Sequence, residues 1–228
     1  MNPVAMHIAN GIVDARVSAA FAVVSLVALG FCVMRGRLDL DDRLAPMAGL
    51  VAAFIFAVQM LNFQVLPGVS GHLLGGALAA VLVGPWVGAL CVATVLIVQC
   101  LLFADGGLTA LGLNIFNMAV LGTAVGYLVA VAVLKLIPKV SVAAFVASVV
   151  SVVIASQGFV LQYALGGTTD LDLGTIAATM AGVHALIGIG EGLIAATTVA
   201  TVARVRPDLV YALRRTTRVT STAAEVPA

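Results

Sequence analysis

The sequence predicts an all-α, polytopic membrane protein: a bundle of about seven transmembrane helices in a single domain of residues 1–228. The first observation is the composition, because 62% of the residues are hydrophobic and 9% are charged, whereas a soluble domain carries about 25% charged residues. So few charges cannot coat a soluble surface, which excludes a cytosolic enzyme, a nucleic-acid-binding protein and a disordered chain. The other two observations are the gathering of apolar residues into seven runs and the one-sided placement of the basic residues.

Seven apolar runs, separated by polar or turn-rich breaks, are the candidate membrane spans. A helix needs about 20 apolar residues to cross the hydrocarbon core of a bilayer. The runs cover residues 17–34, 44–63, 73–83, 86–104, 115–137, 141–165 and 175–205. Residues 1–16 precede the first run as an N-terminal segment, and we expect residues 206–228 to form a polar cytoplasmic tail.

The positions of the basic residues predict on which side of the membrane each loop lies. With seven spans, ten of the eleven Lys and Arg residues lie on one side, and Arg16 is the exception. Basic loops face the cytoplasm, so we expect the N-terminus outside and the C-terminus inside. If residues 73–104 formed one helix, Lys135 and Lys139 would move to the outer side. The charges therefore favour a real turn at Gly84-Pro85, between the third and fourth runs.

The third run is too short to cross the membrane by itself, since it has only eleven residues. We expect its outer end to lie below the outer surface. A neighbouring loop then dips into the membrane, which is tolerated only where the backbone is buried in protein or lines a cavity. The polar break at residues 64–72 lies beside this short helix and is a candidate wall of a binding site.

Three histidines and one acidic residue are the candidates for chemistry. The predicted topology puts His7, His72 and His184 toward the outside. Histidine is the commonest metal ligand, and nitrogen donors without a carboxylate pair suit Ni²⁺, Co²⁺, Cu²⁺ or Zn²⁺ rather than Mg²⁺ or Ca²⁺. The alternative is that each ring is only a hydrogen-bonded core or loop residue. Glu191 lies on nearly the same helix face as His184, and we expect this pair to brace the last helix within the bundle.

No sequence motif indicates an enzyme. There is no P-loop and no Gly-x-Ser-x-Gly nucleophile motif. The glycine-rich stretch at residues 188–192 lies inside an apolar helix and follows no strand, so it is not a dinucleotide-binding fingerprint. A catalytic site would have to use His184 and Glu191 alone. We therefore expect no catalytic residues.

Six segments of the chain resemble the CbiM/NikM family, and the likeness runs from residue 6 to about residue 206. The segments are Met6-His7-Ile8, FAVQMLNF at 56–63, GVSGHLLGG at 68–76, QCLLFADGG at 99–107, LGLNIFNM at 111–118 and VHALIGIGEG at 183–192. The stretch from Asn62-Phe63 to Ser-Gly-His-Leu-x-Gly-Gly is the most specific of them. The chain therefore resembles the substrate-capture (S) component of energy-coupling factor transporters for cobalt or nickel.

This resemblance implies partners and a location in the cell membrane. The partners are a coupling transmembrane protein of the CbiQ/NikQ type, two cytoplasmic ATPases of the CbiO/NikO type and a small membrane subunit of the CbiN/NikN type. The chain itself lies in the lipid bilayer, and no nucleic acid takes part. The chain would capture Co²⁺ or Ni²⁺ outside, topple within the membrane and release the ion inside, and we expect no cofactor besides this transported ion. ATP hydrolysis would belong to the partner subunits.

The resemblance also implies a metal site built on an N-terminal Met-His, so residues 1–16 are expected to form an N-terminal metal-binding segment. The ligands would be the amine of Met6, the backbone and ring nitrogens of His7, and the ring of His72. Four nitrogens in a plane suit Ni²⁺ or Cu²⁺, and binding must release protons, so affinity should fall as pH drops. Three further residues either hydrogen-bond the site or cap turns; they are Asn62, Gln64 and Ser70.

Five residues, 1–5, precede the Met-His pair and depart from the family's pattern. If they stay, Met6 has no free amine and the chelate loses a ligand. We expect translation to start at Met6. The alternative is that the five residues are removed after translation, which would also give Met6 a free amine. The choice between cobalt and nickel stays open: cobalt would serve cobalamin biosynthesis, and nickel a nickel enzyme.

Two other functions compete with metal capture for an importer. A stand-alone secondary carrier for a metal or small solute would use His184 and Glu191 as an intramembrane relay. A structural or assembly subunit without a ligand would tolerate replacement of His72.

Overall fold

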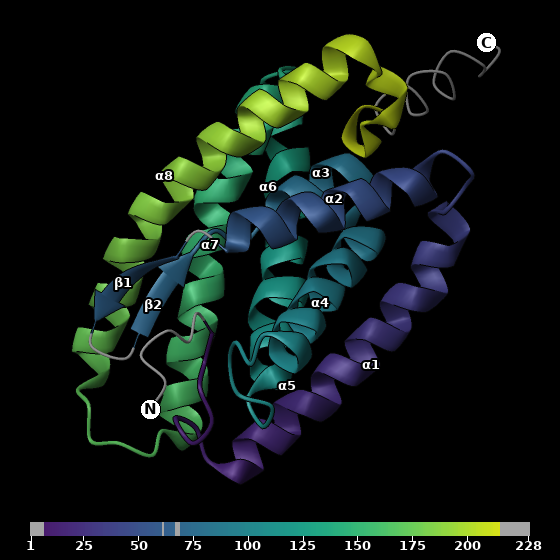
Figure 1. Cartoon of the computed structure of the whole chain (residues 1–228). Coiled ribbons are helices and arrows are strands. Elements are labelled where there is room, and N and C mark those ends of the chain that lie inside the picture. Colours follow the sequence, from purple (N-terminus) through teal and green to yellow (C-terminus); the bar gives the residue numbers. More distant parts are fainter. Residues whose placement is uncertain (1–6, 61, 67–68, 215–228) are drawn as a thin grey trace, which may run out of the picture.

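The computed structural model describes residues 7–60, 62–66 and 69–214 (Figure 1). The elements are α1 (Ala15–Asp39), α2 (Leu44–Gln59), β1 (Asn62–Leu66), β2 (Val69–His72), α3 (Gly76–Val83), α4 (Pro85–Leu102), α5 (Leu111–Asn114), the π-helical turns η1 (Ile115–Gly122), α6 (Thr123–Leu136), α7 (Val140–Gly166), α8 (Leu173–Val205) and the 3₁₀ turn η2 (Pro207–Leu209). The predicted all-α class is confirmed, with one small hairpin added.

All seven apolar runs are helical over most of their length. Five helices in the described part of the chain are long and apolar enough to cross a membrane: α1, α4, the continuous helix Leu111–Leu136, α7 and α8. The apolar helices α2 and α3 are shorter, with 16 and eight residues. The protein is therefore a multi-pass membrane protein, and seven full crossings stay a prediction. The start of the fifth run was predicted too late, because helix α5 begins at Leu111, inside the predicted break at residues 105–114.

Local sequence signals account for where the main helices begin. Asp14 caps α1 by accepting a hydrogen bond from the backbone N–H of Val17 at 2.8 Å. Asp172 caps α8 in the same way through Thr175 at 2.7 Å, and such caps satisfy backbone donors that the first turn leaves free. The predicted turn between the third and fourth runs is confirmed: Gly84, at φ +87°, separates α3 from α4.

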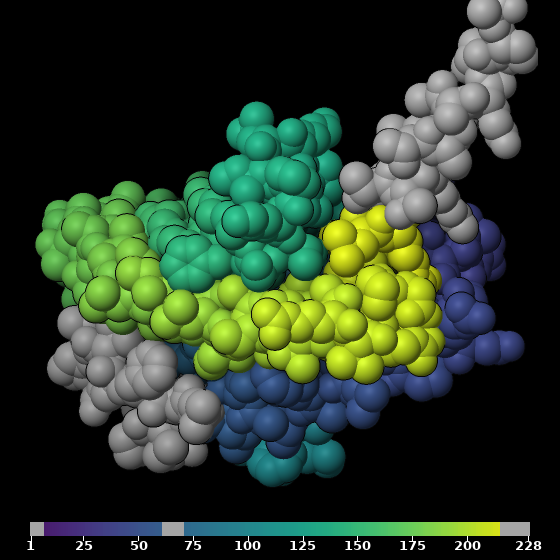
Figure 2. Space-filling model, turned by 90° about the horizontal axis from the view of Figure 1, so that it is seen from above, coloured from purple at the N-terminus to yellow at the C-terminus, as the bar shows by residue number. Residues whose placement is uncertain are grey.

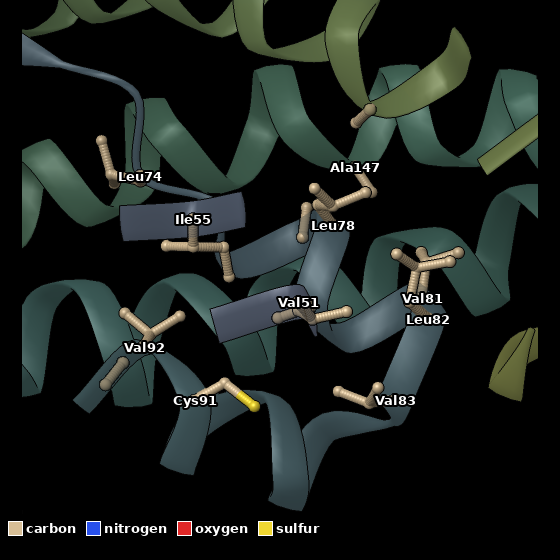
Figure 3. Close-up of a cluster of buried hydrophobic side chains, with 14 of the residues drawn as sticks. Val51, Ile55, Leu74, Leu78, Val81, Leu82, Val83, Cys91, Val92 and Ala147 are labelled. Atoms are coloured by element: carbon tan, nitrogen blue, oxygen red, sulfur yellow. The ribbon is translucent and has the colours of Figure 1, made fainter. Parts of the chain in front are cut away.

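Helix α3 is the centre of the bundle. Every residue of Gly76–Val83 is buried, and Figure 3 shows its side chains among those of α2, α4 and α7. Small residues let the neighbouring backbones approach, as in other membrane bundles: a Cβ on Gly76 would lie 3.1 Å from the backbone of Gly122. An eight-residue helix is stable here because the longer helices surround it.

Helix α8 covers one face of the molecule. It has 33 residues, which makes it about 50 Å long at 1.5 Å per residue. Figure 2 shows it, in green to yellow, running across most of the width of this face. A Cβ on Gly188 would lie 3.0 Å from the backbone of Val149, so this glycine allows close contact between α8 and α7. Helix α8 thus joins the two ends of the molecule in one rigid element.

The chain after α2 forms a β-hairpin, which the sequence analysis did not predict. The second apolar run was expected to continue to residue 63, but α2 ends at Gln59. Strand β1 then pairs antiparallel with β2, with Asn62 opposite His72. Away from water every backbone N–H and C=O needs a partner, and a hairpin supplies these partners within a short segment. The hairpin delivers His72 to the N-terminal side of α3.

Different loops lie at the two ends of the bundle. At one end, Arg43 and Arg214 lie 3.8 Å from Asp208 and Asp41 respectively. At the other end, the N-terminal segment bonds to the loop at residues 105–107 and, through the Val13–Gly167 bridge, to the end of α7. This grouping agrees with the sorting of loops by charge. Which end faces the cytoplasm stays a prediction.

The first residues of the predicted polar tail pack against the bundle. Residues 207–209 form η2 and residues 211–214 a further helical turn. Val210 is fully buried and Ala212 is 6% exposed. Apolar residues at these two positions bring the chain back onto the bundle, and a polar cytoplasmic tail at residues 206–228 stays a prediction. Residues 215–228 lie outside the described residues.

Candidate metal centre

The N-terminal segment is held to the bundle by hydrogen bonds to Ile8. The side chain of Asn114 accepts from the Ile8 N–H at 3.1 Å and donates to the Ile8 carbonyl at 3.3 Å. The N–H of Gly107 donates to the same carbonyl at 2.9 Å. Because both backbone groups of Ile8 are fixed, the neighbouring His7 is fixed as well, and its side chain is only 2% exposed.

The loop at residues 105–107 fits closely around His7. Gly106 has φ +79°, a left-handed conformation that favours glycine. A Cβ on Gly106 would lie 2.8 Å from the Cβ of His7. A larger residue would therefore be strained and would also push His7 away, so this glycine allows the backbone to pass beside the imidazole.

A hydrogen bond fixes the tautomer of His7. Its Nε2 lies 3.0 Å from Oε1 of the fully buried Gln99. An amide oxygen only accepts, so Nε2 carries the proton and Nδ1 carries the lone pair. Nδ1 is buried, and no group in the described part of the chain bonds to it. A buried lone pair without a partner is costly, and a metal ion would satisfy it.

A hydrogen bond also fixes the tautomer of His72, whose ring faces the imidazole of His7. Its Nδ1 donates to the carbonyl oxygen of Leu73 at 2.8 Å, which leaves the lone pair on Nε2. The centroids of the two imidazole rings are 4.6 Å apart, and the ring planes are nearly perpendicular at 85°. Metal-binding histidines commonly have the second ring nitrogen fixed by such a bond. Residues 65 positions apart in the sequence therefore meet with one lone pair each.

The electrostatics of this pair favour a cation over a proton. Burial lowers the pKa of His7 to about 4, although the bond to Gln99 opposes the shift. Burial and then the neighbouring His7 lower the pKa of His72 to about 3. Both rings are neutral at neutral pH, which is the form that binds a metal. The carboxylate of Asp105 lies 3.7 Å from Nε2 of His7 and adds negative charge to the site.

Side chains from two helices hydrogen-bond the segment between His72 and α3. Oε2 of Glu191, on α8, accepts from the Leu74 N–H at 2.6 Å. Nε2 of Gln59, at the end of α2, donates to the Leu74 carbonyl at 2.8 Å. Gln59 is fully buried and Glu191 is 3% exposed. Glu191 thus connects α8 to the segment that carries His72.

His184, on α8, lies beside His7 and His72. Its Nδ1 lies 2.8 Å from the Met180 carbonyl, so its lone pair is on Nε2. A cavity of about 110 Å³ is lined by His7, His72 and His184 together. The structure therefore gathers the three histidines around one cavity, whereas Glu191 is not part of its wall and bonds Leu74 instead.

Several predicted site residues fall outside what the structure describes. Met6 lies outside the described residues, and so do the side chains of Asn62, Gln64 and Ser70. Among the described residues, no three His, Cys, Asp or Glu side chains form a metal-binding group by themselves. The predicted site needs only two such side chains, because two of its four nitrogens belong to the main chain.

Sequence reasoning missed three residues that shape this site: Gln99, Asp105 and Asn114. Each is buried, and each contacts His7 or Ile8 as described above. The available signal was their polarity at the edge of apolar runs. A polar side chain in such a place needs a buried partner, but only the fold identifies that partner as the N-terminal segment.

Comparisons with known proteins agree with this picture. The profile of a family described as the cobalt uptake substrate-specific transmembrane region, CbiM, matches residues 7–209. A fused nickel transport protein, NikMN, predicted in Archaeoglobus fulgidus is 40% identical over 205 residues, which are 90% of this chain and 68% of that protein. The cobalt transport protein CbiM of Sorangium cellulosum is 31% identical over 217 residues, 92% of this chain and 96% of that protein.

The fold has a counterpart among solved structures. The crystal structure of a truncated transition metal transporter superposes with a TM-score of 0.82 at 26% identity. The match covers 87% of this chain and 99% of that one. The arrangement of helices in Figure 1 is therefore that of a transition metal transporter.

Proposed function

Because this chain belongs to the family of cobalt uptake substrate-specific transmembrane regions, we propose that it captures one Co²⁺ or Ni²⁺ ion outside the cell and delivers it inward as part of an ATP-driven importer of the energy-coupling factor type. The names of the relatives, which are cobalt and nickel transport proteins, support this choice of ion. Within the chain one observation carries the proposal: Nδ1 of His7 is buried without a partner among the described residues.

In this proposal the ion has four nitrogen ligands. They are the amine of Met6, the backbone nitrogen and Nδ1 of His7, and Nε2 of His72. The two tautomers support this set, since they leave these two ring nitrogens with their lone pairs. Asn62, Gln64 and Ser70 would hydrogen-bond the ligands from the hairpin. A planar set of four nitrogens favours nickel over cobalt.

The N-terminal amine decides whether this chelate can form, so the test compares two chains. A protein that begins at Met6 is expected to bind one Ni²⁺ or Co²⁺ ion, read as one added metal in its intact mass. A matched protein that retains residues 1–5 is expected to bind far more weakly, because Met6 then has an amide nitrogen instead of an amine. Equal affinity of the two proteins would contradict the chelate.

The two histidines supply the second test of the same site. His7→Ala and His72→Ala, each in the chain that begins at Met6, are expected to abolish tight binding. Ser148→Ala, which changes a buried side chain on α7, is the control for general damage to the bundle. Unchanged metal affinity after the His72 substitution would instead favour a structural subunit without a ligand.

We propose that the chain works with a coupling membrane protein of the CbiQ/NikQ type, cytoplasmic ATPases of the CbiO/NikO type and a small CbiN/NikN-type subunit. The fused NikMN relative supports the small subunit, because its name joins the two components in one chain. In vesicles, the chain alone should bind metal without accumulating it, and accumulation should require the partners and ATP. Accumulation by the chain alone would favour the stand-alone carrier.

A further inference from the structure

We propose that the cavity between the three histidines is a second station for the transported ion, where a partly hydrated divalent transition-metal ion binds Nε2 of His184. This inference rests on the proposed function, because the ion at this station comes from the chelate at His7 and His72 or moves toward it. The station is on α8, on a different element from either of those residues.

The geometry of His184 is that of a prepared ligand. The residue is 7% exposed, and its Nδ1 donates to the Met180 carbonyl at 2.8 Å. That bond fixes the tautomer with the lone pair on Nε2. No described residue bonds to Nε2, and the side chain lines the cavity. A fixed tautomer with its lone pair toward a cavity is the arrangement seen in metal-binding histidines.

The cavity has room for a hydrated ion. Its volume of about 110 Å³ is several times the roughly 10–15 Å³ that one ordered water needs. An ion in a planar four-nitrogen site has few or no waters, so an ion that leaves this site must recover ligands. The space beside His72 can hold the waters that it recovers.

The remaining polar groups of the described cavity wall are already engaged. The side chain of Asn114 makes its two bonds to Ile8, and Asn117 pairs with Gln162 at 2.8 and 2.9 Å. The hydroxyl of Ser156 donates to the Val153 carbonyl at 2.7 Å. The side-chain donors of the described wall that are left without a hydrogen bond are therefore histidine ring nitrogens and the thioethers of the lining methionines.

These donors select the kind of ion and the strength of binding. Imidazole and thioether groups suit borderline and softer transition-metal ions, whereas Mg²⁺ and Ca²⁺ prefer oxygen ligands. One imidazole with water ligands binds more weakly than a four-nitrogen chelate. The station therefore fills transiently, or when metal is in excess, and it does not compete with the chelate for storage of the ion.

The test uses Ni²⁺ and the histidine signals of the protein that begins at Met6, in lipid nanodiscs. The chain has only three histidines, so ¹⁵N-labelled imidazoles can be assigned from the His7→Ala and His72→Ala variants. The first equivalent of Ni²⁺, being planar and diamagnetic, should shift the signals of His7 and His72 and leave that of His184 sharp. Further Ni²⁺, six-coordinate and paramagnetic at the station, should broaden the His184 signal.

The outcomes separate the two proposals. A His184 signal that stays sharp in excess Ni²⁺, after the first equivalent has bound, overturns the second station and leaves the chelate intact. A first equivalent that leaves the signals of His7 and His72 unchanged overturns the proposed function itself.

Exchange kinetics give an independent readout. His184→Leu should leave the equilibrium affinity for the first ion unchanged and should slow its transfer to an external chelator several-fold. Phe159→Leu also changes a side chain of the cavity wall but removes no metal donor, so it is the matched control and should exchange like the parent. An unchanged transfer rate in His184→Leu, or a lowered affinity for the first ion, would overturn the proposal.

Discussion

At the scale of single residues, the orientation of His7 depends on a neighbour 92 positions away. Gln99 is fully buried, and its oxygen holds the proton on Nε2 of His7. Without that bond the proton can move to Nδ1, where it would block the lone pair. A residue on α4 therefore controls the nitrogen that the N-terminal segment offers to a metal.

Replacing Gln99 by Leu is expected to lower metal affinity about 10- to 100-fold, the usual cost of losing a partner that orients a ligand. Isothermal titration with Ni²⁺ measures it. Gln162→Leu is the matched control, because Gln162 is also fully buried and bonds Asn117 instead of a proposed ligand. If both variants lose the same affinity, the bond to His7 has no special role.

Gly106 gives a second prediction at this scale. Gly106→Ala forces a side chain into a left-handed conformation, which costs about 1–2 kcal/mol, and places its Cβ against His7. Both the melting temperature and the metal affinity should fall. Gly182→Ala is the control: Gly182 lies in α8 with nothing within 4 Å of an added Cβ, so stability should be unchanged or higher. Equal behaviour of the two variants would contradict the close fit.

At the scale of elements, α8 and α2 hold the segment that leads from His72 to α3. Glu191 and Gln59 bond the two backbone groups of Leu74. A displacement of α8 would therefore be transmitted to His72 through a single residue. This mechanical link explains why an acidic side chain is buried within a membrane helix.

Glu191→Leu removes the acceptor for the Leu74 N–H and leaves that group buried, which costs about 1–3 kcal/mol. We expect lower thermal stability and weaker Ni²⁺ binding. Glu191→Gln keeps an acceptor oxygen and should retain most of both. If the Gln variant is as damaged as the Leu variant, the negative charge itself is required and the clamp is an insufficient explanation.

At the scale of the whole molecule, the loops at the two ends predict the orientation in the membrane. Asp42 is exposed at the end that carries Arg43 and Arg214, and Asp170 is exposed at the end that carries the N-terminal segment. In a Cys100→Ala background, Asp42→Cys should resist a membrane-impermeant maleimide on whole cells, whereas Asp170→Cys should react. The buried Cys32 and Cys91 remain as internal controls. The reverse labelling pattern would invert the predicted topology.

The sequence predicted most of the fold because a membrane-spanning helix has a local signature. Length and hydropathy decide whether a segment can be helical in lipid, so seven runs led to seven helical segments, and Gly84-Pro85 marked the turn between α3 and α4. The hairpin before His72 was missed because its strands are short and are stabilised by pairing with each other. The return of Val210 to the core was missed because its contacts come from distant segments.

The sequence by itself determined the membrane class, the helical segments and the identity of the histidines, since these depend on composition, hydropathy and recognisable local motifs. Only the tertiary structure decided that His7, His72 and His184 border one cavity, which tautomer each ring adopts, and that Glu191 bonds Leu74 outside the cavity wall. The physical reason is that a buried polar group must be paired wherever the fold puts it. Packing in three dimensions decides which partner each of these groups finds: Gln99 for His7, Leu73 for His72, Met180 for His184 and Leu74 for Glu191.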